Sequence, residues 1–168
     1  MFYFENLNDH KSCVKLGLSG KAVTGMIVST KGRYALSVMM DLAEHNTGEY
    51  LLLNDIAARQ GISEKYLEGI MASLSKAGLV HSLRGRGGGY RLAKSPEEYT
   101  VGDILKLTEG SLAPVSCTEG RGASCARAAE CRMYPMWARL DRMIFDYFEG
   151  ITVADLVREG GGGDNYVI

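Results

Sequence analysis

Residues 81–93, HSLRGRGGGYRLA, constrain the fold of this chain more than any other stretch, because they place four glycines and three arginines between two short apolar runs. The runs at 79–83 and 90–93 are strand candidates, and the RGRGGG between them is typical of a β-hairpin tip. Glycine permits positive φ and a close approach of the backbone, and arginine neutralises phosphates. The stretch therefore predicts an exposed, cationic hairpin.

A phosphate-cradling nucleotide loop is the alternative interpretation of the same glycines. Such a loop runs from a strand into a helix, so that the N-terminus of the helix faces the anion. Here the loop leads into a second strand candidate and then to Ser95 and Pro96, and it lacks the Lys-Ser/Thr pair of a P-loop. The context therefore excludes a nucleotide-binding loop of this kind.

Two helices are predicted directly before the hairpin. Asn54 is the expected cap of a brief helix, DIAARQ, which Gly61 ends. Ser63 is the expected cap of a second helix, EKYLEGIMASLSK, whose apolar side chains share one face. These side chains are Leu67, Ile70, Met71 and Leu74. Two helices joined by a tight glycine turn form the helix-turn-helix pattern, and a hairpin that follows it directly is a wing.

Charge is distributed unevenly along a chain whose formal net charge is only −1. Residues 63–94 contain six basic and two acidic side chains, a local charge of +4. Residues 95–168 contain seven basic and twelve acidic side chains, a local charge of −5, and residues 1–62 are balanced. A basic middle beside an acidic C-terminal part predicts one face that binds a polyanion.

The other elements are predicted from capping residues and periodicity. The expected caps are Ser29 or Thr30 for a helix ending near Glu44, Thr100 for VGDILKLTEG and Thr152 for VADLVRE. LLL at 51–53 is a possible short strand. A longer helix is expected from Met133 to Glu149.

The longer helix has an apolar surface that is wide for one exposed helix. This surface comprises Met136, Leu140, Met143 and Tyr147, with Trp137, Ile144 and Phe148 alongside. The small domain offers little else to cover it. The pattern therefore indicates either a buried core face or the seam of a dimer.

Four parts are expected along the 168 residues. They are a loosely ordered leader at 1–25, a winged helix-turn-helix DNA-binding domain at 26–95, a cysteine loop with dimerisation helices at 96–160 and a flexible tail at 161–168. No apolar stretch approaches the roughly 20 residues that span a bilayer. The N-terminus also lacks a basic start followed by an apolar run. We therefore expect a cytoplasmic protein without a membrane partner.

Three of the four cysteines fall within fifteen residues, in CTEGRGASCARAAEC. They are Cys117, Cys125 and Cys131. In a cytosolic protein such a group indicates metal or redox chemistry rather than disulfides. The spacing differs from the C-x-x-C of structural zinc, and no histidine is near in sequence. Three thiolates on a flexible loop suit an iron–sulfur cluster, while a zinc site, a thiol redox switch and coincidence remain open alternatives.

An iron–sulfur cluster on these cysteines needs a further ligand. Tyr134, Glu130 and Glu119 are candidates within the chain. A residue from a second subunit or a small thiol would serve equally.

The segments STKGRYAL, DIAARQGISEKYLEGIMASLSKAGLV, SLRGRGGGYRLA, VGDIL and the three-cysteine loop occur in this order between Met26 and about Glu159. In this order the chain resembles the iron–sulfur cluster regulator family. This family is part of the Rrf-two superfamily of winged helix-turn-helix transcription factors, which also holds nitric-oxide-sensing and cysteine-metabolism repressors. The resemblance implies a mainly α fold, a winged helix-turn-helix domain with a long C-terminal dimerisation helix, and a homodimer bound to a double-stranded DNA operator.

The resemblance and the wing pattern together assign DNA-binding residues. These are Ser63, Lys65, Tyr66 and Glu68 at the groove-facing start of the recognition helix, with Arg84 and Arg86 in the wing. A glutamate accepts a hydrogen bond from cytosine N4 and repels unpaired phosphate, so we expect Glu68 to contribute discrimination more than affinity. The iron–sulfur cluster regulator has a glutamine after the matching glutamate, where this chain has Gly69.

The resemblance also implies that Cys117, Cys125 and Cys131 hold an iron–sulfur cluster. The ligand histidine of the iron–sulfur cluster regulator corresponds to Tyr134 here. The aspartate ligand of the nitric-oxide sensors corresponds to Arg33. The fourth ligand and the cluster type, 2Fe-2S or 4Fe-4S, are therefore open.

The sequence as a whole predicts a homodimeric, sequence-specific DNA-binding regulator, in the role of a repressor, that senses iron–sulfur, redox or nitric-oxide state through its cysteine loop. One alternative is a DNA-binding regulator that responds to a partner protein or a small molecule and has inert cysteines. A second alternative is a thiol-dependent redox enzyme. No histidine or paired carboxylates lie near the cysteines in sequence to act as a base, so we expect no enzyme.

Overall fold

The computed structural model describes residues 28–85, 87–121, 125 and 127–160, and the predicted leader and tail lie outside these ranges. Within them the chain is mainly helical with one small antiparallel sheet, as predicted. In chain order the elements are α1 (Thr30–Glu44), α2 (Leu53–Gln60), α3 (Glu64–Lys76), β1 (Val80–Leu83), β2 (Gly89–Leu92), η1 (Pro96–Glu98), α4 (Val101–Glu109), η2 (Ser116–Arg121), α5 (Tyr134–Glu149) and α6 (Val153–Gly160).

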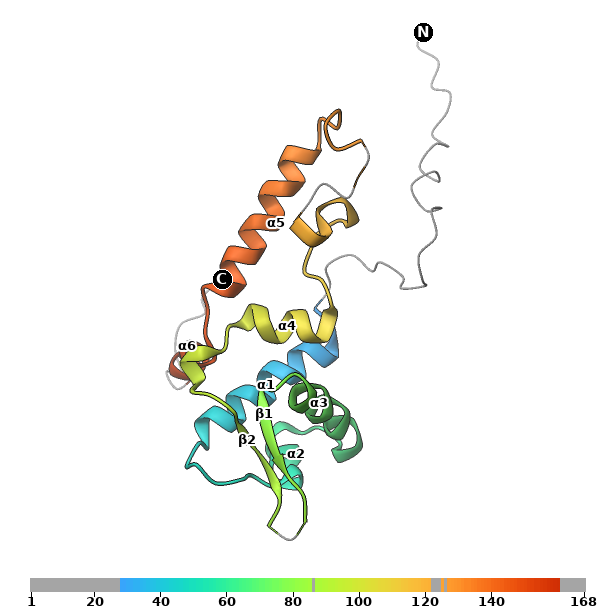
Figure 1. Cartoon of the computed structure of the whole chain (residues 1–168). Coiled ribbons are helices and arrows are strands. Elements are labelled where there is room, and N and C mark those ends of the chain that lie inside the picture. Colours follow the sequence, from blue (N-terminus) through green and yellow to red (C-terminus); the bar gives the residue numbers. More distant parts are fainter. Residues whose placement is uncertain (1–27, 86, 122–124, 126, 161–168) are drawn as a thin grey trace.

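Helix α1 is the central element, because it packs against α2 and α3 and also against α4 and α6 (Figure 1). Ser29 caps it as predicted: the Ser29 Oγ accepts a hydrogen bond of 3.2 Å from the backbone N–H of Gly32. The inward side chains of Ala35, Val38 and Met39 are fully buried. Helix α1 is therefore the platform on which the helix-turn-helix rests.

Helix α2 begins two residues earlier than predicted, and the prediction that Asn54 caps it is wrong. Leu52 occupies the N-cap position without a side-chain capping bond, and the Asn54 Oδ1 accepts instead from the N–H of Asp55. The partly buried Leu53 packs against the core, and this contact extends the helix beyond the point where the capping signal would start it. The end agrees with the prediction, because Gly61 adopts a left-handed φ of 62° that suits a residue without Cβ.

Helix α3 covers the predicted residues. Ser63 lies at its N-cap position, although its hydroxyl makes no capping bond. The predicted apolar face is buried at Leu67, Ile70, Met71 and Leu74. Because α3 packs with this face toward α1 and α2, its opposite face is turned outward.

Strands β1 and β2 form the predicted hairpin, with Leu83 opposite Gly89 in antiparallel register. The short strand predicted at 51–53 is reduced to one residue. Leu51 exchanges two backbone hydrogen bonds of 2.9 Å with Tyr90, and the chain then enters α2. The helix start at Leu53 leaves no room for a longer third strand.

Tyr99 closes the base of the hairpin. The residue is buried, and its hydroxyl donates to the carbonyl of Leu79 at 2.9 Å and accepts from the N–H of Lys94 at 2.6 Å. Burial raises the pKa of this hydroxyl above its ordinary value near 10, so the group stays neutral at physiological pH. Tyr99 thus ties together the chain on either side of the two strands.

The C-terminal helices begin at two neighbouring threonine caps, both of which agree with the prediction. The Thr100 Oγ1 accepts from the N–H of Asp103 at 3.0 Å, and the Thr152 Oγ1 accepts from the N–H of Asp155 at 3.1 Å. The carboxylate of Asp155 accepts in return from the N–H of Thr152, which completes a capping box. Thr100 and Thr152 also form an isolated β-bridge, which fixes α4 and α6 to each other.

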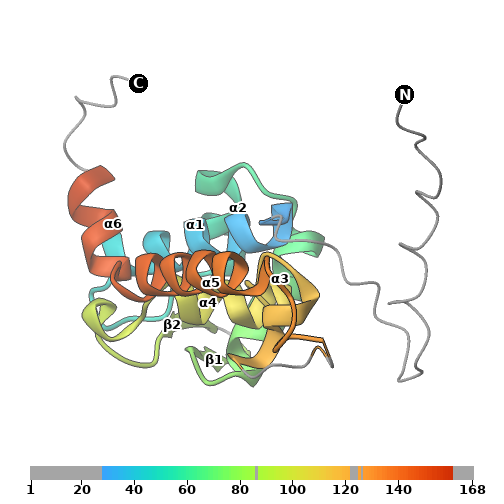
Figure 2. The same cartoon turned by 90° about the horizontal axis from the view of Figure 1, so that it is seen from above.

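Helix α5 extends as a long arm from the rest of the fold, and the view from above shows it lying across α4 (Figures 1 and 2). None of its residues is buried. Ile144 and Phe148 pack partly against a second apolar core, which Val101, Leu105 and Leu112 form. In the part of the chain that the structure describes, most of the wide apolar surface of α5 is therefore uncovered.

No helix of this part is long and apolar enough to cross a membrane.

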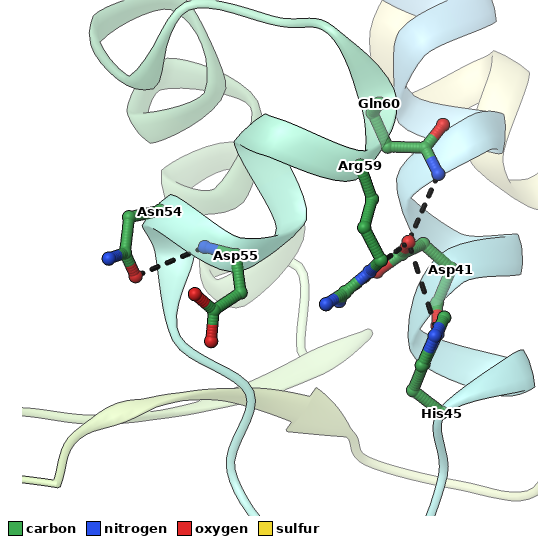
Figure 3. A network of polar contacts seen from close by, with 6 residues as sticks. All are labelled: Asp41, His45, Asn54, Asp55, Arg59 and Gln60. Atoms are coloured by element: carbon green, nitrogen blue, oxygen red, sulfur yellow. Dashed lines mark hydrogen bonds and ion pairs between the residues drawn. The ribbon is translucent and has the colours of Figure 1, made fainter.

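A buried carboxylate joins α1 to the end of α2 (Figure 3). Asp41 is 1% exposed, and it accepts hydrogen bonds from Arg59 at 2.8 and 2.7 Å and from the side-chain amide of Gln60 at 3.0 Å. The ring Nδ1 of His45 lies 2.8 Å from the carbonyl oxygen of the same aspartate. Since Arg59 and Gln60 are the last residues of α2, this network holds the helix-turn-helix against α1.

Opposing effects act on the pKa of Asp41. Burial raises it, whereas the hydrogen bonds from Arg59 and Gln60 and the charge of Arg59 lower it, and the net pKa lies below the ordinary value. A carboxyl whose pKa is lower in the folded than in the unfolded state contributes stability that is fully present above the unfolded pKa of about 3.9. This contribution is lost as the pH falls through the folded pKa.

We expect the Asp41→Asn variant to lose about 2 kcal/mol of unfolding free energy at pH 7, because charge-assisted hydrogen bonds from Arg59 and Gln60 weaken. The difference from the unmodified protein should be smaller at an acidic pH below the ordinary aspartate pKa of about 3.9, because the charge of Asp41 is lost as the pH falls through its lowered folded-state pKa. Urea unfolding at both pH values measures it. Glu44→Gln, an exposed change on the same helix, is the control and should leave the stability unchanged. An equal loss at both pH values would contradict the role of the charge.

Candidate nucleic-acid interface and cysteine segment

The start of α3 brings together four of the predicted nucleic-acid-binding residues, and all four are exposed. They are Ser63, Lys65, Tyr66 and Glu68. Their backbone is held by the burial of the opposite face of the helix, so the side chains project from a fixed support. This arrangement is what a helix needs in order to read the edges of bases in a groove.

The ring of Tyr66 is oriented by a second aromatic ring from α1. Tyr34 meets it edge to face, with 5.8 Å between the ring centroids and an angle of 80° between the planes. Tyr66 nevertheless stays 42% exposed. Tyr34 is not among the residues predicted from the sequence; the signal that could have found it is an aromatic residue beside two basic ones in STKGRYAL. The contact links the second turn of α1 to the first turn of α3.

Beyond Glu68 the outer face of α3 carries small side chains. Gly69 and Ala72 are both exposed, and a Cβ atom at Gly69 would have no neighbour within 4 Å. The backbone of α3 is therefore accessible along this face. A partner surface can approach the helix closely here.

The hairpin tip depends on glycines for two different reasons. Gly85 and Gly87 have φ values of 100° and 77°, a region that residues with side chains rarely adopt. Gly89 faces the third strand position, where a Cβ atom would collide with the carbonyl of Leu51. Arg84 is exposed beside this tip. The remaining predicted wing residue, Arg86, lies outside the described residues.

Arg91 is a basic residue of the hairpin whose side chain makes contacts within the fold. Its Nη1 donates to the carbonyl oxygen of Gly48 at 3.1 Å, and its guanidinium lies 4.8 Å from the centroid of the Tyr50 ring. These contacts hold the turn after α1 against β2. The positive charge of residues 63–94 is therefore divided between exposed groups such as Arg84 and this bound arginine.

Helix α3 and the hairpin are held together as one unit. The hydroxyls of Ser75, near the end of α3, and Ser82, in β1, are 3.3 Å apart and hydrogen-bonded. Figure 1 shows α2, α3 and the hairpin tip at the end of the molecule remote from the arm formed by α5. An outward helix with an attached cationic hairpin is the arrangement of a winged helix-turn-helix.

The three cysteines lie between α4 and α5. Cys117 is in η2, Cys125 is in a bend and Cys131 precedes α5; each is partly exposed and forms no disulfide. The carbonyl of Cys131 accepts from the N–H of Tyr134 at 3.2 Å, so this cysteine is attached to the first residue of α5. Tyr134 and the buried Thr118 both line a crevice of about 300 Å³ between η2 and α5.

The donor set of this segment fits a thiophilic metal centre in its chemistry. Three accessible thiols in one segment suit iron–sulfur clusters, and soft thiolate ligands select such centres. The geometry of a site is a separate matter: the described residues contain no group of three or more His, Cys, Asp or Glu side chains arranged to hold a metal ion. Residues 122–124 and 126, between the cysteines, are outside the described ranges. Glu119 and Glu130, two of the candidate fourth ligands, are exposed.

Comparison with known proteins places these features in one family. Residues 28–159 match the Rrf2 family, described as iron-dependent transcriptional regulators. The HTH-type transcriptional regulator IscR of Aliivibrio salmonicida is 39% identical over 132 residues, which cover 79% of this chain and 77% of that protein. The protein of the same name from Vibrio campbellii is 37% identical over 134 residues, 80% of this chain and 79% of its own length.

Solved structures show the same relationship. CymR, the global cysteine regulator of B. subtilis, has a TM-score of 0.66 and 34% identity, covering 79% of this chain and 97% of its own. IscR of T. potens has a TM-score of 0.61 and 36% identity, covering 84% of this chain and 96% of its own. The predicted winged-helix fold class is thereby confirmed. These relatives are regulators rather than enzymes, as expected from the sequence.

Proposed function

The chain belongs to the Rrf2 family of transcriptional regulators, and from this premise we propose that it acts as a cytoplasmic, homodimeric repressor whose affinity for its operator depends on an iron–sulfur cluster. Residues 26–95 form the DNA-binding part and residues 96–160 the sensing and dimerising part. The observation that carries the proposal is the joint exposure of the start of α3 and of Arg84 in the attached hairpin. The four-part division of the chain and the roles of individual residues are parts of this proposal.

In the proposed complex, α3 enters the major groove and the hairpin lies along the flanking backbone. Lys65 neutralises a phosphate or contacts guanine, while Ser63 and Tyr66 contact the backbone at the edge of the groove. Glu68 accepts a hydrogen bond from cytosine N4 and so rejects other bases. Arg84 and Arg86 neutralise phosphates or enter the minor groove.

A homodimer is supported by the uncovered apolar stripe of α5. Its exposed side chains recur with alternating spacings of three and four residues, which is the pattern of a two-helix seam. They are Met133, directly before the helix, and Met136, Leu140, Met143 and Tyr147 within it, between 37% and 65% exposed. A two-fold pairing of α5 would bury the same stripe on both chains and set the distance between the two α3 helices.

The cysteines support the sensing role. Cys117, Cys125 and Cys131 would hold the iron–sulfur cluster, which when bound supplies a centre that gains or loses electrons and reacts with oxidants or nitric oxide. The chain connects this segment directly to α5, because the carbonyl of Cys131 accepts from the N–H of Tyr134. A displacement of the segment would therefore change the position of α5 and the spacing of the recognition helices. A coupling of about 1–3 kcal/mol changes DNA affinity roughly 5–150-fold.

We expect Arg84→Ala to weaken binding to every duplex and to reduce the slope of log K against log salt by about 0.9 for each phosphate that the side chain neutralises. Fluorescence anisotropy at several salt concentrations measures this. Glu68→Ala is the matched variant, because it removes an acidic group from the same surface. It should broaden the site recovered by selection from random DNA more than it lowers the affinity for the preferred site. An unchanged salt slope in Arg84→Ala would refute the wing contact.

We expect Met143→Glu to convert the dimer into single chains, because two charges would meet in the apolar seam. Sedimentation at micromolar concentration should show the mass fall from two chains to one, 18.3 kDa. Arg142→Gln is the control, since its exposed side chain lies on another face of α5 by helical spacing. A single-chain mass for the unmodified protein would reject the proposed dimer.

We expect protein purified without oxygen to be coloured and to contain iron and sulfide. Cys125→Ala should lose most of the visible absorption, because one thiolate ligand is missing. Cys13→Ala, which removes the cysteine outside the proposed ligand set, is the control and should keep the colour. Colourless protein that contains zinc would exclude the iron–sulfur centre.

A further inference from the structure

Two charged residues of α5 border its uncovered apolar stripe on the side away from the rest of the chain. At about 3.6 residues per turn, Arg139 and Asp146 project from one edge of the stripe, and both are exposed. Ile144 and Phe148 border the other edge, where they pack against the second apolar core. The edge that carries Arg139 and Asp146 is therefore turned away from the chain to which it belongs.

These two charges are not neutralised by one another. Side chains that pair along one helix are three or four positions apart, whereas Arg139 and Asp146 are seven positions apart. Within the described residues, none of the ion pairs includes either side chain. A positive and a negative charge, one heptad apart beside an apolar stripe, are therefore available to a second helix.

A second copy of α5 offers the complementary charges in one alignment. About a two-fold axis that crosses the seam, the two helices run antiparallel, and Leu140 of one chain can pack beside Met143 of the other. Arg139 stands one position before Leu140, and Asp146 stands three positions after Met143. In an antiparallel pair these two positions lie side by side at the edge of the seam. The symmetry of the dimer forms the contact twice.

The neighbouring alignments of the same stripe bring like charges together. If the helices slide by one heptad in one direction, Arg139 meets Arg139 of the second chain. A slide in the other direction brings Asp146 against Asp146. Because the apolar side chains of the stripe are similar in size, they would tolerate each alignment, whereas like charges disfavour two of the three. Charge thus distinguishes one alignment from its neighbours.

From this pattern we propose that Arg139 of one chain forms an ion pair with Asp146 of the second chain, twice in each dimer, and that these pairs select a second copy of the same chain as the partner of α5. The inference rests on the proposed function and adds the residues that decide which chain is accepted. A related regulator with an equally apolar helix and other charges at these positions would leave like or unpaired charges at the edge. Exposed ion pairs add little affinity, so their effect is on partner choice.

The test reverses the two charges in separate full-length chains. Arg139→Glu brings two acidic groups together at both contacts with its own copy, and Asp146→Arg brings two basic groups together. In a mixed dimer of these variants, both contacts join opposite charges. The two variants carry different fluorophores, and energy transfer after mixing measures the mixed dimer at about 0.1 M and about 1 M salt. Sedimentation measures the self-association of each variant, and thermal unfolding shows that each is folded.

The control replaces the first variant by Arg142→Glu, which reverses a charge on the same helix further from the seam. Mixed with Asp146→Arg, it should give only the statistical share of mixed dimers, because it leaves Arg139 unchanged.

The expected result is weaker self-association of Arg139→Glu and of Asp146→Arg than of the unmodified protein. Their mixture should give an exchange constant about 10–100-fold above the statistical value at about 0.1 M salt, because four repulsive contacts become four attractive ones. At about 1 M salt the preference should shrink, since the contacts are exposed to solvent. The double variant Arg139→Glu/Asp146→Arg should recover self-association.

A statistical share of mixed dimers from the two variants overturns this inference. It leaves the proposed homodimer standing if the unmodified protein has the mass of two chains and Met143→Glu that of one. A folded double variant that fails to recover self-association has the same meaning. A single-chain mass for the unmodified protein overturns the proposed homodimer itself, and this inference with it.

Discussion

The burial of one face of α3 against α1 is the interaction on which the rest of the structure depends. The two helices are in contact, and Met39 of α1 and Leu67 of α3 both lie in the main core, completely removed from solvent. Each buried side chain of this size stabilises the fold by about 1.5–3 kcal/mol. Because this face is committed to the core, the opposite face of α3 must be presented to solvent. The exposure of its polar side chains follows from the packing of its apolar ones.

Polar contacts on either side of α3 then fix the orientation of this helix, which packing alone would leave adjustable. The carboxylate of Asp41 holds the last turn of α2, directly before the turn at Gly61. The hydroxyl of Tyr99 holds the base of the hairpin that follows α3. Helix α3 is thus secured both before its first residue and after its last. A regulator of the Rrf2 family needs such rigidity, because sequence is read only when side chains meet base edges in a defined register.

Local signals allowed much of this fold to be predicted. The apolar period of α3, the threonine caps at Thr100 and Thr152 and the glycine after α2 act over a few residues, and the structure confirms them. The prediction of a cap at Asn54 is wrong because the packing of the partly buried Leu53 against the core, a tertiary effect, outweighs a local capping preference. Neither periodicity nor caps indicate which distant groups meet.

The same limit applies to the candidate site. The exposure of Lys65, Glu68 and Arg84 follows from amphipathic spacing and from the hairpin pattern, and both are visible in the sequence. The edge contact of Tyr34 with Tyr66 joins residues 32 positions apart, and the Asp41 network spans up to 19 positions. For the thiols, sequence spacing supplies the donors but not their arrangement in space, since the intervening loop determines which of them converge.

The bonds made by Tyr99 have a consequence for the integrity of the hairpin. They connect the residue before β1 to the second residue after β2 through the Tyr99 hydroxyl, so the two strands stay joined at the end of the hairpin that is remote from its exposed glycine-rich tip. If a protease cut the tip, both new chain ends would stay in place, because the strand pairing of β1 with β2 and the bonds of Tyr99 would still hold them. The cleaved protein would keep its hydrophobic core and lose only the conformation of the turn at the hairpin tip.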